Sequence, residues 1–367
     1  MSFGNQLYAK LKGDRVIWMI VAVLSIFSIL SVYSSSTILA YRYSGGNTEW
    51  YLIKHTIFVV LGLFLCYICY MTPYVRYKSI SPYLMLLAIP LLVFTIGFGK
   101  EVNEARRWIE IPFTGLTFQT SDFAKLALII FVANAISKKQ EYIEDFSDAF
   151  LPIIIPVLII CGLIAPADLS TAGVLFFTCL LMMFMGRVSL KYILLLIFLG
   201  IVLFSFLVTI GTMFPELEIV RVDTWAKRWQ EFTDPSFSNI QVTQSKIAIA
   251  NGEWVGVGPG KSMQRNFLPA SESDYIYSII VEEYGLIFGG FLILLLYVIL
   301  FFRCVKIVTQ SPKAFGAMLA LGLGLMICIQ AMINIAVNVN ILPVTGLALP
   351  MVSRGGTSML FSCIAFG

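Results

Sequence analysis

The most regular feature of the chain is the alternation of long apolar stretches with shorter polar segments. A bilayer core about 30 Å thick is crossed by about 20 mostly apolar helical residues, and ten stretches come close to that length. The pattern therefore predicts an all-α polytopic membrane protein with about ten transmembrane helices. The stretches cover residues 16–40, 52–71, 80–98, 118–137, 150–166, 170–186, 190–213, 275–302, 315–340 and 355 onward.

The longest polar interruption of this pattern covers residues 214–274, between the seventh and eighth apolar stretches. It predicts one large loop outside the membrane, within a single membrane domain that covers residues 1–367. The last stretch is still apolar at Gly367, so we expect the chain to stop inside its final helix. The first stretch is too long to be a cleaved signal peptide, and we expect it to form the first helix.

The distribution of Lys and Arg predicts the orientation of these helices, because positive charge is retained on the cytoplasmic side. With the N-terminus in the cytoplasm, 12 Lys and Arg residues fall in cytoplasmic segments and six in the short outer loops. We therefore expect a cytoplasmic N-terminus and an extracytoplasmic loop 214–274. Arg106 and Arg107 then lie outside, where they indicate either an anionic ligand or an Arg-Arg-Trp anchor in the headgroup layer.

Composition agrees with a membrane protein and excludes several other classes. The 25 Lys and Arg and the 21 Asp and Glu residues make up 13% of the chain, about half the share in a soluble domain. So few charges cannot cover a soluble surface, which excludes a soluble enzyme, a disordered chain and a collagen. The net charge of +4 is too small and dispersed to indicate nucleic acid. The seven Cys lie in or beside apolar stretches and do not suggest a disulfide framework.

Several ionisable residues lie at membrane depth, where each costs roughly 2.5–3.5 kcal/mol and so needs a partner or a function. Asp122 and Lys125 are three residues apart and share one helix face, either as a structural ion pair or as a ligand-binding Lys held by an Asp. Lys54 enters the second stretch from the outer side, where a snorkelling side chain explains it almost as well as a site does. Asp168 precedes the sixth stretch and can cap its helix.

The densest polar cluster stands at the end of the long loop. If the following helix begins near Asp274, then Asp274, Ser278 and Glu282 lie on one stripe, with the two carboxylates about 12 Å apart along the axis. A helix cap accounts for Asp274 alone. It does not account for Glu282 and Glu283, which must face other helices or a polar cavity.

The sequence does not support a nucleotide-binding loop or a metal site. Residues 256–262 resemble a phosphate-binding loop, but Val255 stands where that motif needs its first Gly, and Pro259 has no N–H to offer a phosphate. Nucleotide binding is therefore rejected. The chain has one His and no cluster with metal-site spacing, so no metal-ligating residues are predicted. No cofactor is predicted, although the sequence leaves a divalent cation open.

A series of motifs occurs in a fixed order along the chain. They read EARRWI (104–109), QTSDFAK (119–125), DLSTA (168–172), NGEWVGVG (251–258), SDYIYS (273–278), EEYG (282–285), PVTGLALP (343–350) and SRGGTS (353–358). Together they resemble the SEDS family, the FtsW, RodA and SpoVE proteins of bacterial division, elongation and sporulation. The resemblance covers essentially the whole chain.

The resemblance implies a ten-helix fold and a peptidoglycan glycosyltransferase that polymerises lipid II outside the bacterial cytoplasmic (inner) membrane. It implies a class B penicillin-binding protein transpeptidase and other divisome or elongasome proteins as partners. The family's essential acidic residue lies in the motif at 273–278, so the catalytic role carries to Asp274. This sequence departs from the family at Thr120 and Asp122, where Pro and Glu are usual, and at Arg354, where Tyr is frequent.

The residue chemistry fits that implied substrate, which has a diphosphate, a lipid tail and a sugar-peptide head. Arg106, Arg107 and Lys125 can bind the diphosphate and stabilise it as it departs. Asp274 would act as general base on the acceptor sugar hydroxyl, in a single inverting step. The remaining candidate substrate-binding residues are Lys54, Asp122, Glu283 and Ser353.

Two other functions stay open from the sequence, a lipid II flippase or transporter and an inactive scaffold for a transpeptidase. Intramembrane charges fit a transporter equally well, but a general base on the outer face is needed only by the polymerase. Within the family, the segments at 13–18 and 33–36 favour the division branch over an elongation-type, RodA-like polymerase.

Overall fold

The computed structural model describes residues 13–36, 47–102, 105–111, 116–213, 222–234 and 239–367. Within these ranges, seven helices are long and apolar enough to cross a membrane. They are α2 (Arg15–Ser35), α4 (Thr48–Met71), α5 (Tyr74–Phe98), α6 (Thr120–Lys138), α7 with its first turn η2 (Phe146–Ile164), the run of α12, η5 and α13 (Ile276–Gln310), and α14 (Ala314–Asn338).

Three further apolar helices occupy the remaining predicted stretches. They are α8 (Leu169–Met185), α9 (Leu190–Met213) and α15 (Thr357–Phe366). The prediction of a polytopic membrane protein built from α-helices is confirmed, while the count of ten crossings stays a prediction because these three helices are shorter or only partly described.

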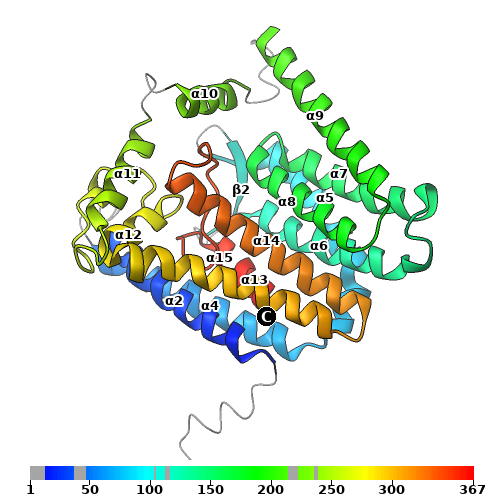
Figure 1. Ribbon diagram of the computed structural model, residues 1–367, viewed down its shortest axis with the longest axis horizontal. Helices are drawn as coiled ribbons and strands as arrows, with labels where there is room; N and C mark the ends of the chain where they lie inside the picture. Colours follow the sequence, from blue (N-terminus) through cyan, green and yellow to red (C-terminus); the bar gives the residue numbers. More distant parts are fainter. Residues whose placement is uncertain (1–12, 37–46, 103–104, 112–115, 214–221, 235–238) are drawn as a thin grey trace, which may run out of the picture.

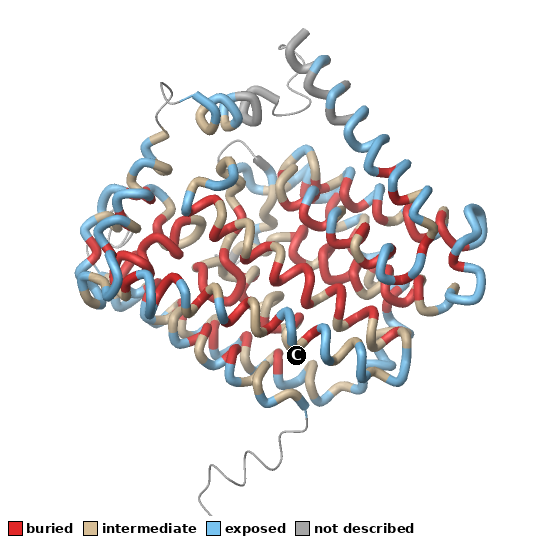
Figure 2. Tube along the Cα trace, in the orientation of Figure 1, coloured by how far each residue is buried: buried red, intermediate tan, exposed pale blue. Residues whose placement is uncertain are grey.

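The bundle is organised around α14. This helix packs against α13 on one side and against α6 and α8 on the other, and buried residues run through the middle of the molecule in Figure 2. Helix α15 packs against α4, where Gly62 allows the close approach: a Cβ on Gly62 would lie 2.6 Å from Cys363 Sγ. Apolar side chains on the outer helices stay exposed, as expected for surfaces that face lipid.

Polar residues determine where several helices begin. Asp14, Asn47 and Asp168 each precede a helix and accept a hydrogen bond from one of its first N–H groups, in α2, α4 and α8 respectively. Such caps satisfy N–H groups that have no partner inside the helix. The capping role expected for Asp168 is therefore confirmed.

Residues 100–102, 105–111 and 116–119, most of which precede the apolar stretch predicted from residue 118, form a small antiparallel sheet. It consists of β1 (Lys100–Val102), β2 (Ala105–Ile111) and β3 (Leu116–Gln119) in that order. Trp108 pairs with Gln119 and Ile109 with Phe118. The sheet ends directly at α6, so it attaches Arg107 and Trp108 to the end of the bundle at which α6 begins.

The segment 214–274 contains α10 (Val222–Thr233), α11 (Ile240–Gly252) and the short turn η4 (Gln264–Asn266). In Figure 1, α10 lies across the end of the bundle that carries β2, between the far end of α9 and α11. The segment after α11 packs closely on α12, because Gly256 and Gly285 both have positive φ and a Cβ on either would lie within 2.5 Å of the other segment's backbone.

Helix α12 begins at Ile276, two residues after Asp274, so the condition for a shared helical stripe is not met. The residues before it form a turn in which Tyr275 N–H donates to Ala270 O. The carbonyl of Asp274 is bound by side chains from α14 and the N–H of Ser278 donates to Asn338 Oδ1. Competing side-chain partners therefore delay the start of the helix by two residues, and Asp274 does not share a helical stripe with Ser278 and Glu282.

Candidate active site

A cavity of about 170 Å³ opens at the end of the bundle that carries β2. Its walls come from β2, α6, the start of α8, the turn before α12, and the segment 346–355. It brings together four predicted site residues that are far apart in the sequence. They are Arg107, Asp122, Lys125 and Asp274, and Asp168 and Arg354 line the same cavity.

Hydrogen bonds to its backbone carbonyl fix the position of Asp274, and the residue lines the cavity. The Asp274 carbonyl accepts hydrogen bonds from Asn334 Nδ2 and Asn338 Nδ2, both 2.9 Å long. Both asparagines are buried on α14. A Cβ on Gly346 would lie 3.7 Å from Asp274 Oδ2, so the carboxylate lies beside a residue without a side chain.

Burial raises the pKa of the Asp274 carboxyl above its ordinary value. The negative charges of Glu272 and Asp168 raise this pKa further, while a hydrogen bond from Ser273 and the positive charge of Arg228 oppose the shift. A carboxylate whose pKa is raised towards neutrality accepts a proton more readily than an ordinary one. The environment of Asp274 therefore suits a general base.

Arg107 is fixed at the wall of the cavity by two contacts. Its Nη1 lies 3.0 Å from Asp168 Oδ2, and its Nε donates to Ala167 O at 2.8 Å. The other oxygen of Asp168 accepts the N–H of Thr171 at the start of α8. One carboxylate thus caps a helix and orients the guanidinium.

Asp122 and Lys125 form the ion pair that their spacing allows, with Lys125 Nζ 2.7 Å from Asp122 Oδ1. Both side chains are buried and both line the cavity. Within the described part of the chain, Asp122 Oδ2 is buried without a hydrogen-bond partner. The pair therefore offers a ligand in the cavity the positive charge of Lys125 and Asp122 Oδ2 as a hydrogen-bond acceptor.

Ser353 holds the chain next to Asp274. Its hydroxyl donates to Ser273 O at 2.5 Å and accepts the N–H of Leu349 at 2.8 Å. The following N–H, that of Arg354, donates to Glu272 O. Ser353 thus contacts backbone and is not among the residues that line the described cavities, so its expected contact with substrate stays a prediction.

Glu282 and Glu283 lie away from the Asp274 cavity and anchor the long loop. Glu282 accepts hydrogen bonds from Ser262 Oγ and from the N–H groups of Met263 and Gln264. Glu283 accepts one from Ser34 Oγ on α2. Neither lines the described cavities. The sequence predicts that these carboxylates face other helices or a polar cavity, and the structure shows that they bind residues of the loop and of α2. Substrate binding by Glu283 stays a prediction.

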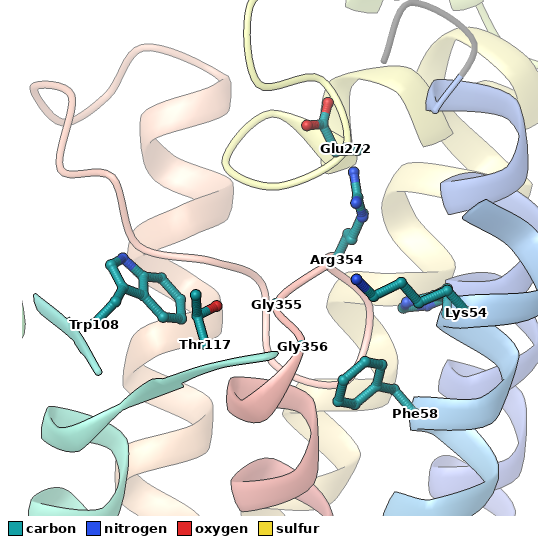
Figure 3. A pocket seen from close by; sticks show the side chains of 9 residues that line it. Lys54, Phe58, Trp108, Thr117, Glu272, Arg354, Gly355 and Gly356 are labelled. Carbon is teal, nitrogen blue, oxygen red and sulfur yellow. The ribbon is translucent and has the colours of Figure 1, made fainter. Parts of the chain in front are cut away.

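The other two predicted cations also lie outside the Asp274 cavity. Arg106 is half exposed, donates to Gly97 O at 3.1 Å and lies 3.6 Å from Glu101 Oε2. Lys54 lines a second, neighbouring cavity together with Arg354, which Figure 3 shows. Substrate binding by Arg106 and by Lys54 stays a prediction.

Asn334, Asn338 and Gln330 were missed by the sequence analysis. Gln330 lines the cavity and donates to Ala348 O at 2.8 Å. The three amides recur every four residues in the ninth apolar stretch, and this spacing places them on one helix face. A search of the apolar stretches for uncharged amides as well as for charged residues would have identified them.

Within the ranges that the structure describes, no group of three or more His, Cys, Asp or Glu residues could hold a metal ion. The divalent cation that the sequence leaves open stays a prediction. The cavity combines one carboxylate with a raised pKa and three cations, of which Arg107 and Lys125 are each paired with a further carboxylate.

The fold is similar to solved structures of bacterial membrane proteins. A peptidoglycan synthase complex that coordinates polymerization and crosslinking contains a chain with a TM-score of 0.73 and 22% identity, over 97% of this chain and 96% of that one. The rod shape determining protein RodA of Thermus thermophilus has a TM-score of 0.67 and 21% identity, over 97% and 95%. At these identities the similarity shows the fold.

The amino-acid sequence has nearer relatives. It is 32% identical to stage V sporulation protein E of Bacillus subtilis over 364 residues, 98% of this chain and 96% of that protein. It is 33% identical to the probable peptidoglycan glycosyltransferase FtsW of Nitrosococcus halophilus over 326 residues, 87% and 82% of the two chains. The sequence profile shared by FtsW, RodA and SpoVE, described as cell cycle protein, matches residues 14–367. The chain therefore belongs to the FtsW/RodA/SpoVE family of cell cycle proteins.

Proposed function

We propose that this protein is a peptidoglycan glycosyltransferase that polymerises lipid II on the outer side of the bacterial cytoplasmic membrane during cell division. The observation that carries the proposal is the cavity that Asp274 lines together with Arg107 and Lys125. The names of the FtsW relatives, probable peptidoglycan glycosyltransferases, support the reaction class.

The cations of the cavity suit the leaving group of this reaction. Lipid II carries its sugar on a diphosphate, and the guanidinium of Arg107 can bind phosphate oxygens with N–H groups that do not contact Asp168. Lys125 adds a second positive charge. Both would stabilise the negative charge that develops on the diphosphate as the anomeric C–O bond breaks. Asp122 Oδ2 would accept a hydrogen bond from a sugar hydroxyl.

Asp274 would act as general base. Its carboxylate takes the proton of the acceptor sugar 4-hydroxyl while that oxygen attacks the donor anomeric carbon and the diphosphate leaves. The donor linkage is α and the linkage in peptidoglycan is β, so a single inverting step accounts for the product. The raised pKa of Asp274 supports this role.

The same proposal includes the orientation and the partners. With the N-terminus in the cytoplasm, the cavity and the loop 214–274 lie on the outer side, where peptidoglycan is made. A class B penicillin-binding protein transpeptidase would bind this chain and cross-link its product. The structural similarity to a chain of a complex that joins polymerization and crosslinking supports such a partner.

The test is polymerisation of lipid II by the purified full chain, alone and with its transpeptidase. Asp274→Ala should fold and bind lipid II but make no polymer, whereas Glu110→Ala, an exposed carboxylate on β2 outside the described cavities, should stay active. Normal glycan strands from Asp274→Ala would overturn the mechanism. Movement of lipid II from one leaflet of a vesicle membrane to the other, by a protein that makes no glycan polymer, would favour the flippase instead.

A further inference from the structure

A second cavity, of about 230 Å³, adjoins the Asp274 cavity. Trp108, Arg354 and Gly355 line both, so the two share a wall. Figure 3 shows Lys54 extending from α4 towards Arg354, with Trp108 and Thr117 across the cavity. Two adjoining cavities are what a reaction that joins two substrate molecules needs, one for each.

Lys54 and Arg354, the two cations of this second cavity, differ from Arg107 and Lys125 in having no ion-pair partner among the described residues. Arg107 and Lys125 each form an ion pair with a carboxylate. Over the described ranges, neither Lys54 nor Arg354 has a carboxylate oxygen within 4.0 Å, and the Arg354 guanidinium lies 4.7 Å above the ring of Tyr51. Their positive charge is therefore available to an external anion.

The remaining charges and the backbone agree with an anion site. One carboxylate, Glu272, lines the cavity against two cations, so positive charge is in excess. Gly355 and Gly356 line it as well and directly precede α15. The N–H groups at the start of a helix favour negative charge, and residues without side chains let a ligand approach the backbone.

We propose that this second cavity binds the diphosphate of the acceptor lipid while the Asp274 cavity holds that of the donor, an inference that rests on the proposed function. Only the donor diphosphate departs: the acceptor 4-oxygen forms the new bond to the donor anomeric carbon, Asp274 takes the acceptor proton, and the donor C–O pair leaves with its diphosphate. The acceptor keeps its own diphosphate, one disaccharide away from the reacting hydroxyl.

The shared wall explains how one acceptor could reach both places. Its diphosphate would lie between Lys54 and Arg354 while its terminal sugar passes Trp108 towards Asp274. Trp108 offers an aromatic face against which a sugar ring can pack. An anionic phospholipid headgroup has the same phosphate chemistry, so the experiment must separate it from the lipid-linked acceptor.

The test counts lipid II molecules bound per chain, in detergent without phospholipid, by native mass spectrometry of the Asp274→Asn variant, which cannot turn over. This protein should bind two lipid II molecules. Adding Lys54→Gln, at a residue that lines the second cavity and not the Asp274 cavity, should leave one, whereas adding Lys246→Gln, which removes an exposed charge on α11 outside the described cavities, should leave two.

Kinetics on the active protein supply a second readout. With a lipid II analogue in which a methylene group replaces the anomeric oxygen, so that the diphosphorus group is kept but cannot leave, usable only as acceptor, Lys54→Gln should raise KM about tenfold. With a 4-hydroxyl-capped lipid II, usable only as donor, KM should stay unchanged, because Lys54 does not line the Asp274 cavity. Lys54→Arg should keep most of the acceptor affinity.

Each outcome decides a different claim. Two lipid II molecules bound to the Lys54→Gln protein, or an unchanged acceptor KM, would overturn the acceptor site. In a parallel measurement with added phosphatidylglycerol, loss of its binding from the Lys54→Gln protein with an unchanged lipid II count would assign the cavity to a phospholipid headgroup instead. Polymerisation by Asp274→Asn, or no lipid II bound to any protein, would overturn the proposed function itself.

Discussion

Arg107 and Asp168, 61 residues apart in the chain, meet at a distance of 3.0 Å between Nη1 and Oδ2. Their ion pair joins the sheet to the cap of α8 at the wall of the Asp274 cavity. The two tasks of Asp168 can be separated by substitution, because an amide can still cap a helix but cannot neutralise a guanidinium.

Asp168→Asn should keep the stability of the protein and reduce polymerisation about tenfold, since Arg107 loses its charged partner. Asp168→Ala should lose the cap as well and be less stable by about 1 kcal/mol. Thermal unfolding and lipid II polymerisation measure the two effects. Equal unfolding temperatures for the two variants would contradict the capping role.

Asn338→Ala should slow polymerisation at least tenfold through kcat, with little change in KM. The substitution removes a donor to Asp274 O and the acceptor of Ser278 N–H, so Asp274 is no longer held in place. Leaving buried groups unpaired also costs about 1–3 kcal/mol of stability each.

Asn134 supplies a matched control for this prediction. It is a buried amide on α6 that donates to Lys78 O and Ser81 Oγ, and it does not line the described cavities. Asn134→Ala should lose comparable stability and keep kcat. If both variants lose kcat equally, the effect of Asn338 is one of stability alone.

The rate of polymerisation should fall on the acid side at a higher pH than an ordinary Asp would cause, because the base works only when deprotonated and burial raises the pKa of Asp274. Glu272→Gln removes a negative charge that raises this pKa and should move the acid limb to lower pH. A pH–rate profile at saturating lipid II checks both statements. A limb that moves to higher pH would refute the assignment.

Asp274→Asn should be more stable than the unchanged protein at neutral pH. A carboxyl whose pKa is raised by folding contributes stability that is present below its unfolded pKa, about 3.9, and lost as pH rises through the folded value. The two proteins should therefore unfold at the same temperature in acid and diverge towards neutral pH. A difference of the opposite sign would show that Asp274 is stabilised as a carboxylate.

Glu282→Ala should loosen the segment 256–266 from α12. It leaves Ser262 Oγ and the N–H groups of Met263 and Gln264 without their acceptor, at about 1–3 kcal/mol each. Limited proteolysis should cut this segment faster than in the unchanged protein. Glu141→Ala, an exposed carboxylate in the connection before α7, should cut no faster.

Much of the fold could be predicted from the sequence because the governing contacts are local. A lipid environment forces each apolar stretch to satisfy its own backbone as a helix, so the apolar stretches correspond to helices. The same locality covers the Asp122–Lys125 pair, three residues apart, and the Asp168 cap.

The start of α12 and the sheet could not be predicted in this way. Asp274 follows the helical pattern of the residues after it, but Asn334 and Asn338, sixty or more residues away, bind its carbonyl and delay the helix. The short strand that carries Arg107 is stabilised by pairing with β1 and β3, and a strand of seven residues between two apolar helices leaves little periodic signal.

The sequence by itself therefore determined the membrane class, the positions of the helices and the candidate acid–base residues, since each depends on hydropathy or on spacings within one helix. Tertiary structure alone decided which of those residues share a cavity. It separated Glu283 and Arg106 from Asp274, joined Lys54 to Arg354 across 300 residues of chain, and added the two asparagines. The physical reason is that such contacts arise from the packing of helices on α14, which no local spacing encodes.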